Sequence, residues 1–294
     1  MTDRRGLAIV VATDGSPSGR AAVATALEFP WPPGTRAAGV VSRRTRATRG
    51  RPGYVVLAFE RHFDAVAART LRMLRRRWPD AQVRVLDAPP VEAILDVARR
   101  EPADAIVLGW RGHGTIRRLL MGSVSRGVVR RATSPVLVVP KRRTRVRQFV
   151  IGIDGSALAQ RAAAFVARLR PPAGGRVLLI AALEPVTLPS SAFLPRAVAA
   201  TIKRELAAAE AESRRRLQDQ LDRAARLLNK AGWRARTAIR SGPPLSVLLD
   251  AVRAERADVL ALGARGSGGV ERLVLGSVAG GALNRCPVPV LVVR

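Results

Sequence analysis

The chain contains the stretch Gly109-Trp-Arg-Gly112-His-Gly114-Thr-Ile-Arg-Arg-Leu-Leu-Met-Gly122-Ser123 and repeats it as Gly263-Ala-Arg-Gly266-Ser-Gly268-Gly-Val-Glu-Arg-Leu-Val-Leu-Gly276-Ser277. Each copy has two glycines three positions apart, nine intervening residues and then Gly-Ser. Each copy follows a short apolar run and leads into a segment that ends in Pro-Val-Leu-Val-Val. A glycine-rich connection from a strand to a helix is a place where backbone N–H groups can hold a phosphate. The repeat therefore predicts two phosphate-binding loops.

The repeat extends over both halves of the chain. Over residues 109–140, half of the 32 positions are identical to the positions 154 residues later. Upstream, Asp14-Gly15-Ser16 returns as Asp154-Gly155-Ser156, at an offset of 140 residues. The offsets differ by 14 residues, so we expect an insertion in the second half, mostly within residues 184–232. A length of 294 residues has room for two domains of about 150 residues each, which we place at residues 1–142 and 148–294.

Short apolar runs alternate with amphipathic segments in both halves. In the first half, the expected strands lie at residues 7–13, 36–42, 83–86, 104–108 and 135–139, with a helix between each pair. Ser18 is the expected N-cap of the first helix. The order predicts an α/β fold: an open, doubly wound, parallel five-stranded sheet in each half, with strand order 3-2-1-4-5.

Two further segments have distinct expectations. The polar, basic segment Lys141–Gln148 has no apolar period and fits a linker or an exposed connection between the domains. Within residues 184–232, a stripe of apolar residues predicts a helix that is longer than its counterpart in the first half. We expect this helix to pack against the body of the protein rather than lie on a membrane surface.

The net charge of +29 is the most unusual feature of the composition. A surface this basic can attract nucleic acid. However, only three of the 51 basic residues are lysines, the arginines are spread over both halves, and the aromatic residues (4%) do not interleave with them. Stacking platforms for single strands are therefore not evident, and nucleic acid is an open but not a favoured partner.

The sequence lacks the features of membrane-spanning, disulfide-bonded and metal-binding proteins. No apolar run approaches the roughly 20 residues that a membrane span needs, so we expect no membrane association and a cytoplasmic location. Cys286 is the single cysteine, which excludes an intrachain disulfide and a cysteine metal cage; we expect a buried structural thiol. His62 and His113 lie far apart without acidic partners at metal-ligand spacing, so no metal site is expected.

The glycine loops combine several features that suit an anion. Gly-Ser at a helix start offers unpaired amides, a hydroxyl and the positive end of the helix dipole. In an open parallel sheet, the ligand crevice lies at the carboxyl ends of the strands, where the loops after strands one and four meet. This places Asp14 beside the first glycine loop and Asp154 beside the second. The structural alternative, that the glycines serve positive φ or close packing, stays open here.

The chain resembles a tandem universal stress protein with two complete domains. The resemblance rests on the motif G-x2-G-x9-G-[ST], together with the Asp-Gly-Ser turn after the first strand and the closing Pro-Val-Leu-Val-Val. It implies two adenine-nucleotide alpha-hydrolase-like domains in tandem. It also implies ATP, with or without Mg, as the cofactor.

The resemblance also implies which residues contact the nucleotide. In the ATP-binding branch of the family, the motif holds ribose and phosphates, while the aspartate after strand one and an apolar residue in strand two contact the adenine part. Carried onto this chain, these positions are Asp14, Val41, Gly109, Gly112, Gly122, Ser123 and Val124, and then Asp154, Ala182, Gly263, Gly266, Gly276, Ser277 and Val278. The family often has glycine just after strand three, which Gly242 matches and Ala88 does not.

The final strands are implied to form a dimerisation edge. Residues 135–139 and 289–293 would then pair the two domains with each other; the alternative is that they are ordinary edge strands blunted by proline. A homodimer also stays open.

The implied function is a nucleotide-binding regulatory protein of the stress response. The sequence shows no paired catalytic carboxylates, no supported Ser/His/Asp set and no Walker lysine. It also lacks the His-x-Gly-His and Ser-Gly-Gly-x-Asp-Ser elements expected of adenylyl-transferring enzymes. No dedicated catalysis is expected, while slow ATP hydrolysis stays open. The alternative is a basic module for nucleic acid or a protein partner, with vestigial nucleotide sites.

Overall fold

The structure is a computed structural model that describes residues 6–43, 53–112, 121–184, 196–266 and 275–294. The elements of the first half are β1 (Ala8–Ala12), α1 (Pro17–Glu28), β2 (Arg36–Ser42), α2 (Gly53–Arg75), β3 (Gln82–Leu86), α3 (Pro90–Arg100), β4 (Ala105–Gly109), α4 (Ser123–Arg131) and β5 (Val136–Val139). Those of the second half are β6 (Gln148–Gly152), α5 (Ala157–Arg168), β7 (Arg176–Leu183), α6 (Arg196–Lys230), β8 (Arg234–Ser241), α7 (Pro244–Ala254), β9 (Val259–Gly263), α8 (Ser277–Arg285) and β10 (Val290–Val293). Each half follows the expected alternation of strands and helices.

The described strands form one continuous ten-stranded sheet in the order β3-β2-β1-β4-β5-β10-β9-β6-β7-β8. Within each half the strands are parallel, and the order 3-2-1-4-5 is confirmed for both. The two sheets are not separate, because β5 and β10 pair in antiparallel fashion with Leu137 opposite Leu291. We call this pairing the seam. The prediction that the last strands pair the two domains is confirmed, and the alternative of two free edges is wrong.

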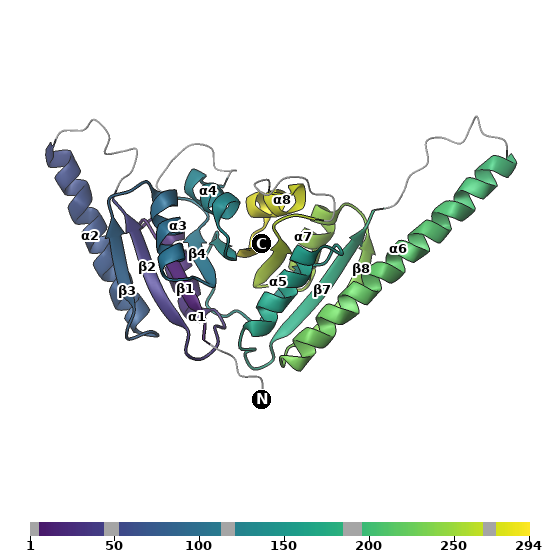
Figure 1. Ribbon diagram of the computed structural model, residues 1–294, viewed down its shortest axis with the longest axis horizontal. Helices are drawn as coiled ribbons and strands as arrows, with labels where there is room; N and C mark the ends of the chain where they lie inside the picture. The colour runs from purple at the N-terminus through teal and green to yellow at the C-terminus, as the bar shows by residue number, and fades with distance from the viewer. Residues whose placement is uncertain (1–5, 44–52, 113–120, 185–195, 267–274) are drawn as a thin grey trace.

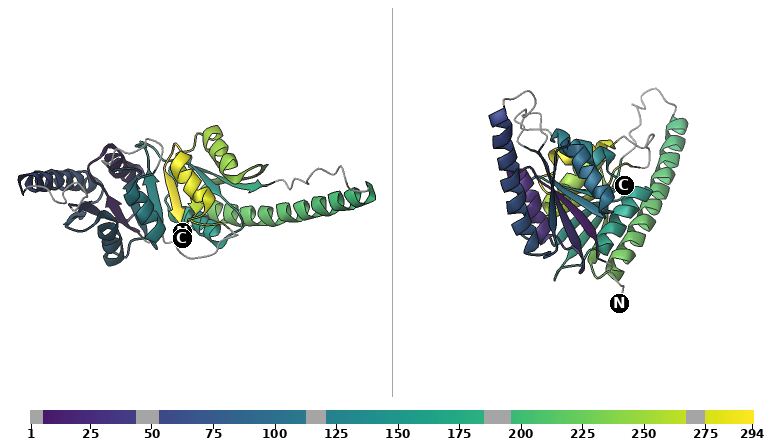
Figure 2. Two further views of the ribbon diagram at one scale, coloured as in Figure 1. Left: turned by 90° about the horizontal axis from the view of Figure 1, so that it is seen from above. Right: turned by 60° about the vertical axis from the view of Figure 1, so that its left-hand side comes forward.

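Two helix layers cover the sheet, and each layer draws on both halves (Figures 1 and 2). Helices α1, α2, α5 and α6 pack on one face through one hydrophobic cluster. Helices α3, α4, α7 and α8 pack on the other face through a second cluster. Strand residues alternate between the faces, and the inner strands are apolar at nearly every position, as a sheet covered on both sides requires. The edge strands β3 and β8 carry polar residues as well. The helix layers leave the loops at the strand ends as the places where ligands have access.

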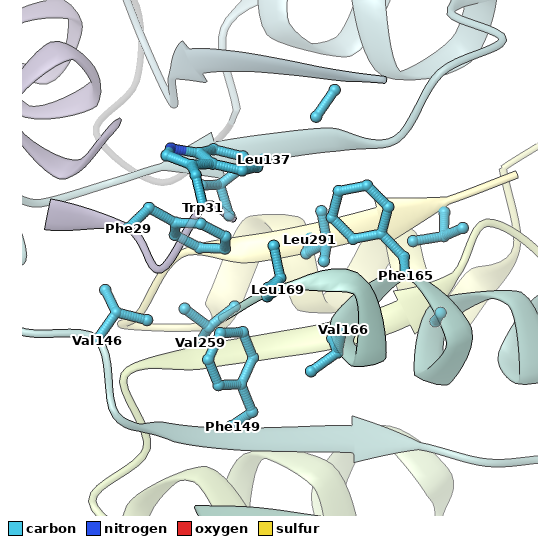
Figure 3. Close-up of a cluster of buried hydrophobic side chains, with 14 of the residues drawn as sticks. Phe29, Trp31, Leu137, Val146, Phe149, Phe165, Val166, Leu169, Val259 and Leu291 are labelled. Atoms are coloured by element: carbon cyan, nitrogen blue, oxygen red, sulfur yellow. The ribbon is translucent and has the colours of Figure 1, made fainter. Parts of the chain in front are cut away.

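The core continues across the seam. Figure 3 shows Phe29 from the first half beside Phe149 from the second, with Leu137 and Leu291 close by. The rings of Phe29 and Phe149 meet edge to face with centroids 5.9 Å apart, and Phe149 meets Trp233 in the same way at 5.2 Å. Phe149 is fully buried. The two halves therefore share one apolar core on this face.

The connection between the halves, residues 141–148, is anchored to the body of the protein at a few points. Val146 is 3% exposed and lies in the shared core (Figure 3). The amide of Arg143 donates to Thr25 Oγ1 of α1 (3.1 Å), and Gln148 already belongs to β6. The expectation of an exposed connection holds for most of the segment, since residues 141, 142, 144, 145 and 147 are exposed. The buried Val146 is the exception, and it anchors the segment to the shared core.

Helix α6 carries the insertion, and it packs over only part of its length. It has 35 residues, against 23 in α2. Near its C-terminus, Leu221 and Leu228 are fully buried, whereas Val198 is 44% exposed. Figures 1 and 2 show its N-terminal half projecting beyond the sheet. The expectation of a packed helix therefore holds for the C-terminal half only. Within the described ranges, no helix is both long enough and apolar enough to cross a bilayer.

Candidate functional site

The turn after β1 holds Asp14 by its own backbone. The amide of Ser16 donates to Asp14 Oδ1 (3.0 Å), and Gly15 supplies a φ of +79° that other residues rarely adopt. The second half repeats this turn, with the amide of Ser156 donating to Asp154 Oδ1 (2.9 Å). One carboxylate oxygen is thus engaged by the turn in each half, and the other oxygen faces the glycine loop.

The glycines of the loop allow a very close approach to this turn. A Cβ on Gly112 would overlap Oδ2 of Asp14, and a Cβ on Gly266 would lie 2.6 Å from Oδ2 of Asp154. A Cβ on Gly109 would lie 2.6 Å from the backbone of Ser18, at the start of α1. The structure thus brings Asp14 and Asp154 beside the loops to which the sequence assigned them.

The loop closes at the start of the next helix. The amide of Gly122 donates to the Trp110 carbonyl (3.0 Å), and the amide of Gly276 donates to the Ala264 carbonyl (2.9 Å). Gly122 and Gly276 are the N-cap residues of α4 and α8, with no side-chain cap.

The helix starts beyond these caps have backbone amides without an intrahelical partner. In α4 the first intrahelical bond runs from Arg126 N to the Gly122 carbonyl (3.0 Å), so the amides of Ser123 and Val124 precede the helical bonding pattern. In α8 the same place is taken by Ser277 and Val278, because Gly280 N makes the first bond to the Gly276 carbonyl (2.9 Å). Ser123 and Ser277 are exposed. Each half therefore presents bare amides, a hydroxyl and a positive helix end beside an aspartate.

The predicted strand-two contacts do not lie at equivalent positions. Strand β2 starts opposite β1 at Arg36, and β7 starts opposite β6 at Arg176, so Ala182 corresponds to Ser42 and not to Val41. Val41 is fully buried under α2, whereas Ala182 packs on the other face of the sheet. A slip of one residue along a strand reverses the face, so the pairing of Val41 with Ala182 is wrong. The 140-residue offset applied to Ala182 would have found Ser42.

Ser18 has a different role from the one expected. Ser16 is the N-cap of α1 and accepts from the Gly19 amide (3.1 Å). The Ser18 hydroxyl instead donates to the Arg111 carbonyl and accepts from the Arg111 amide (3.1 Å for the latter). It therefore fastens the glycine loop to α1. The second half has Leu158 at this position, so this fastening is specific to the first half.

The remaining predictions concern the centres of the glycine loops, the position after strand three, metal ligands and the cysteine. The central parts of both glycine loops, residues 113–120 and 267–274, lie outside the described residues. Gly242 has a φ of +133°, which favours glycine, while the Ala88 carbonyl accepts from the Ser42 hydroxyl (2.6 Å). Among the described residues, no three His, Cys, Asp or Glu side chains gather in a way that could hold a metal. Cys286 is buried as expected, and burial raises the pKa of its thiol to about 11.

Comparison with known proteins adds the family. The model of the universal stress protein family matches residues 8–140 and again residues 145–294. The chain belongs to this family. A universal stress protein of Mycobacterium tuberculosis strain H37Rv is 28% identical over 221 residues, which are 70% of this chain and 66% of the relative. A second one from the same strain is 30% identical over 222 residues, which are 71% of this chain and 64% of the relative. The matches thus span just under two thirds of these relatives.

Solved structures agree on the fold. A universal stress protein from Archaeoglobus fulgidus superposes with a TM-score of 0.67 at 18% identity, covering 99% of this chain and 97% of the other. A putative universal stress protein from Pseudomonas aeruginosa gives a TM-score of 0.59 at 15% identity, covering 99% and 94%. At these identities the likeness shows the fold alone, and it extends over both halves of this universal stress protein.

In this universal stress protein, the second half also holds the loop of the first. Trp110 Nε1 donates to the Leu283 carbonyl of α8 (2.6 Å), and the amide of Met121 donates to Asn284 Oδ1 (3.1 Å). The Asn284 amide is oriented by its own helix, because Nδ2 donates to the Gly280 carbonyl (3.0 Å). These contacts, which we call the α8 clamp, lie directly before the turn at Gly122.

Among the described residues, the α8 clamp has no equivalent in the opposite direction. At the 154-residue offset, Trp110 corresponds to Ala264, and Asn284 corresponds to Arg130, whose side chain has no acceptor. Sequence reasoning missed both residues because a contact between the two halves leaves no local pattern. The signal available was the difference between the repeats at these two positions.

We expect Asn284→Ala to loosen the first loop. A buried amide that loses its acceptor costs about 1–3 kcal/mol, so the Met121 amide should exchange with deuterium at least about tenfold faster. Hydrogen exchange read by mass spectrometry on the peptide that contains Met121 measures this without any ligand. Arg130→Ala is the matched control and should leave exchange near Leu275 unchanged. Equal exchange of the Met121 peptide in Asn284→Ala and the wild type would contradict the clamp.

Proposed function

We propose that each half of this universal stress protein binds ATP or a related adenine nucleotide, and that the chain acts as a nucleotide-responsive regulator in the stress response. The observation that carries the proposal is the same in both halves. An aspartate held by its own turn lies against a loop glycine, and the loop ends at a helix start whose first amides have no intrahelical partner. Two copies with the same geometry argue against glycines kept for packing alone. The cytoplasmic location and a homodimer stay predictions.

The residues at each site fit an adenine nucleotide. The phosphates carry negative charge, so they belong at the amides of Ser123 and Val124 in the first half and of Ser277 and Val278 in the second. The Oδ2 oxygen of Asp14 or Asp154 is an acceptor that repels phosphate, so it suits a ribose hydroxyl or an amino group. The absent Cβ of Gly112 lets the glycine loop approach this carboxylate closely, because a Cβ there would overlap Asp14 Oδ2. For the strand-two contact with the nucleotide, we assign Ser42 instead of Val41 in the first half and keep Ala182 in the second.

The site supports binding more than catalysis. A bound nucleotide would bring any Mg through its own phosphates, because the described residues offer no cluster of three metal-ligating side chains. The described parts of both sites hold one carboxylate each and no base that faces a nucleophile. We therefore propose occupancy of the sites, rather than turnover, as the signal. Slow hydrolysis by bound water stays an open outcome of the test.

Two variants with an added negative charge test the sites one at a time. Gly122 has a φ of −62° and Gly276 a φ of −61°, which any residue can adopt. Gly122→Glu and Gly276→Glu place a carboxylate at the helix start. The helix dipole stabilises this negative charge, and the negative charge repels phosphate. At an effective dielectric constant of about 20, charges about 4 Å apart interact by about 4 kcal/mol, so a loss of at least ~100-fold in affinity is expected.

Nucleotide released from denatured protein and calorimetric titration with ATP give the readout. The wild type should bind two equivalents of ATP per chain, and each glutamate variant should bind one. Gly122→Gln and Gly276→Gln are the matched controls for size, since a Cβ meets the Arg111 or Arg265 backbone at 3.2 Å in either case. Absence of nucleotide and of ATP binding in the wild type would overturn the proposal. Steeply salt-dependent RNA or DNA binding by such a protein would then favour the basic-module alternative.

A further inference from the structure

A hollow lies between α1 and α2 of the first half, apart from the nucleotide site. Its volume is about 380 Å³. Among its lining residues, Val23 is buried and Val66 and Met73 are partly buried, and these three form its apolar floor. None of the residues assigned to the nucleotide lines it, although Gly15 in its wall is the neighbour of Asp14. Small-molecule sites have volumes of roughly 300–1,000 Å³, so the hollow is large enough for a small organic ligand.

The rim of the hollow is cationic. Arg20, Arg69 and Arg72 line it together with His62, and the lining contains no acidic side chain. Arg20 is held in place, because its Nη1 donates to the carbonyl of Gly15. Among the described residues, none of these three arginines takes part in an ion pair. An apolar floor under a cationic rim suits an anion with an apolar body.

The second half shows the same groove bridged by side chains. The buried series Ala67, Thr70 and Leu74 of α2 corresponds to Leu221, Ala224 and Leu228 of α6. At this offset of 154 residues Val66 corresponds to Gln220. At the 140-residue offset of the upstream segments, Arg20 of α1 corresponds to Gln160 of α5.

These two glutamines join across the groove. Gln160 Nε2 donates to Gln220 Oε1 (2.9 Å) and to the Gln220 carbonyl (3.2 Å). Arg223 and Arg226, the counterparts of Arg69 and Arg72, are retained beside this bridge. The two halves therefore carry similar charge, but the first has Val66 and Arg20 in place of the bridge.

We propose that the α1–α2 hollow binds a small organic anion with an apolar body, of the aryl sulfonate or medium-chain carboxylate class. The apolar body lies on Val23, Val66 and Met73, and the acid group is held by Arg69 and Arg72. Because the hollow shares the Thr13–Ser16 turn with the first nucleotide site but not its contact residues, the proposal stands whether or not ATP binds. It gives the first half a ligand that the second half does not take.

The test is a fluorescence titration of the full chain with 8-anilinonaphthalene-1-sulfonate, with decanoate as competitor and decanol as its uncharged analogue. We expect one saturable site, displaced by decanoate at lower concentration than by decanol, and not displaced by ATP. The double variant Arg69→Glu/Arg72→Glu should weaken binding at least tenfold. Its matched control, Arg223→Glu/Arg226→Glu, changes the net charge by the same amount and should stay within twofold of the wild type.

A second variant tests the shape without adding negative charge. Arg20→Gln/Val66→Gln transfers the glutamine bridge of the second half into the first and should abolish the site. Urea denaturation checks that each variant is folded. Equal losses in the two charge-reversal variants would show non-specific attraction to a basic surface and overturn the proposal. Displacement by ATP, or unchanged binding in the bridged variant, would overturn it as well.

Discussion

Replacing Leu291 by aspartate is expected to destabilise the chain by at least about 4 kcal/mol. Leu291 is fully buried at the centre of the seam, directly opposite Leu137, which is also fully buried. A carboxylate there has no cationic partner across the strand pair, and the effective penalty for burying an unpaired ion is several kcal/mol. The lost leucine packing adds to it, since removing a buried leucine side chain costs about 2–5 kcal/mol.

Urea denaturation measures the change in free energy of unfolding, and trypsin reports on the seam itself. The basic segment 141–147 should become a preferred cleavage site in Leu291→Asp, because Val146 is anchored only while the shared core is intact. Leu291→Met is the control: it conserves volume and should cost less than about 1.5 kcal/mol. An unchanged urea midpoint for Leu291→Asp would mean that the seam is not closed in solution.

Phe149→Ala is expected to cost about 3–5 kcal/mol, the range for a buried phenylalanine. The effect should extend beyond the second half, because Phe149 packs edge to face against Phe29 of the first half and against Trp233. Trp31, whose ring lies 4.5 Å from Phe29, belongs to the first half. We therefore expect tryptophan fluorescence and far-ultraviolet circular dichroism to report one coincident unfolding transition at a lower urea concentration.

A double-mutant cycle with Phe29→Ala separates contact from burial. Edge-to-face pairs contribute about 0.5–1.5 kcal/mol beyond their burial, so the two substitutions should be non-additive by about that amount. Tyr54→Ala is the control, because Tyr54 is 76% exposed and a change there should stay within about 0.5 kcal/mol. Two separate transitions, with only one shifted by Phe149→Ala, would contradict a shared core.

The architecture was predictable because its signals are local and occur twice. The glycine stretch, the Asp-Gly-Ser turn and the apolar runs determine the strand order of each half and place Asp14 beside Gly112. Parallel sheets need helical crossovers, so the alternation left few topologies to consider. Because both halves carry the same pattern, the prediction for one half supports the prediction for the other.

The errors arose where a position depends on something other than a local pattern. Val41 and Ala182 were paired one residue out of register, and strand periodicity turns that into the wrong face. Ser18 and Ser16 are both good N-cap residues, and the contact of Ser18 with Arg111 decides between them. The α8 clamp joins residues more than 160 positions apart, so no periodicity marks it. The amphipathic stripe of α6 is continuous, although the sheet ends beneath its midpoint (Figure 1).

The seam also determines how the corresponding sites of the two halves can diverge in evolution. In a symmetric homodimer every substitution appears twice, once in each copy of the interface. Here the halves that meet at β5 and β10 are encoded separately, so a residue can be altered on one side only. Trp110 faces α8 without a counterpart, and Arg20 stands where the other half has Gln160. Fusion into one chain thus allows heritable asymmetry, through which two similar sites can acquire different tasks.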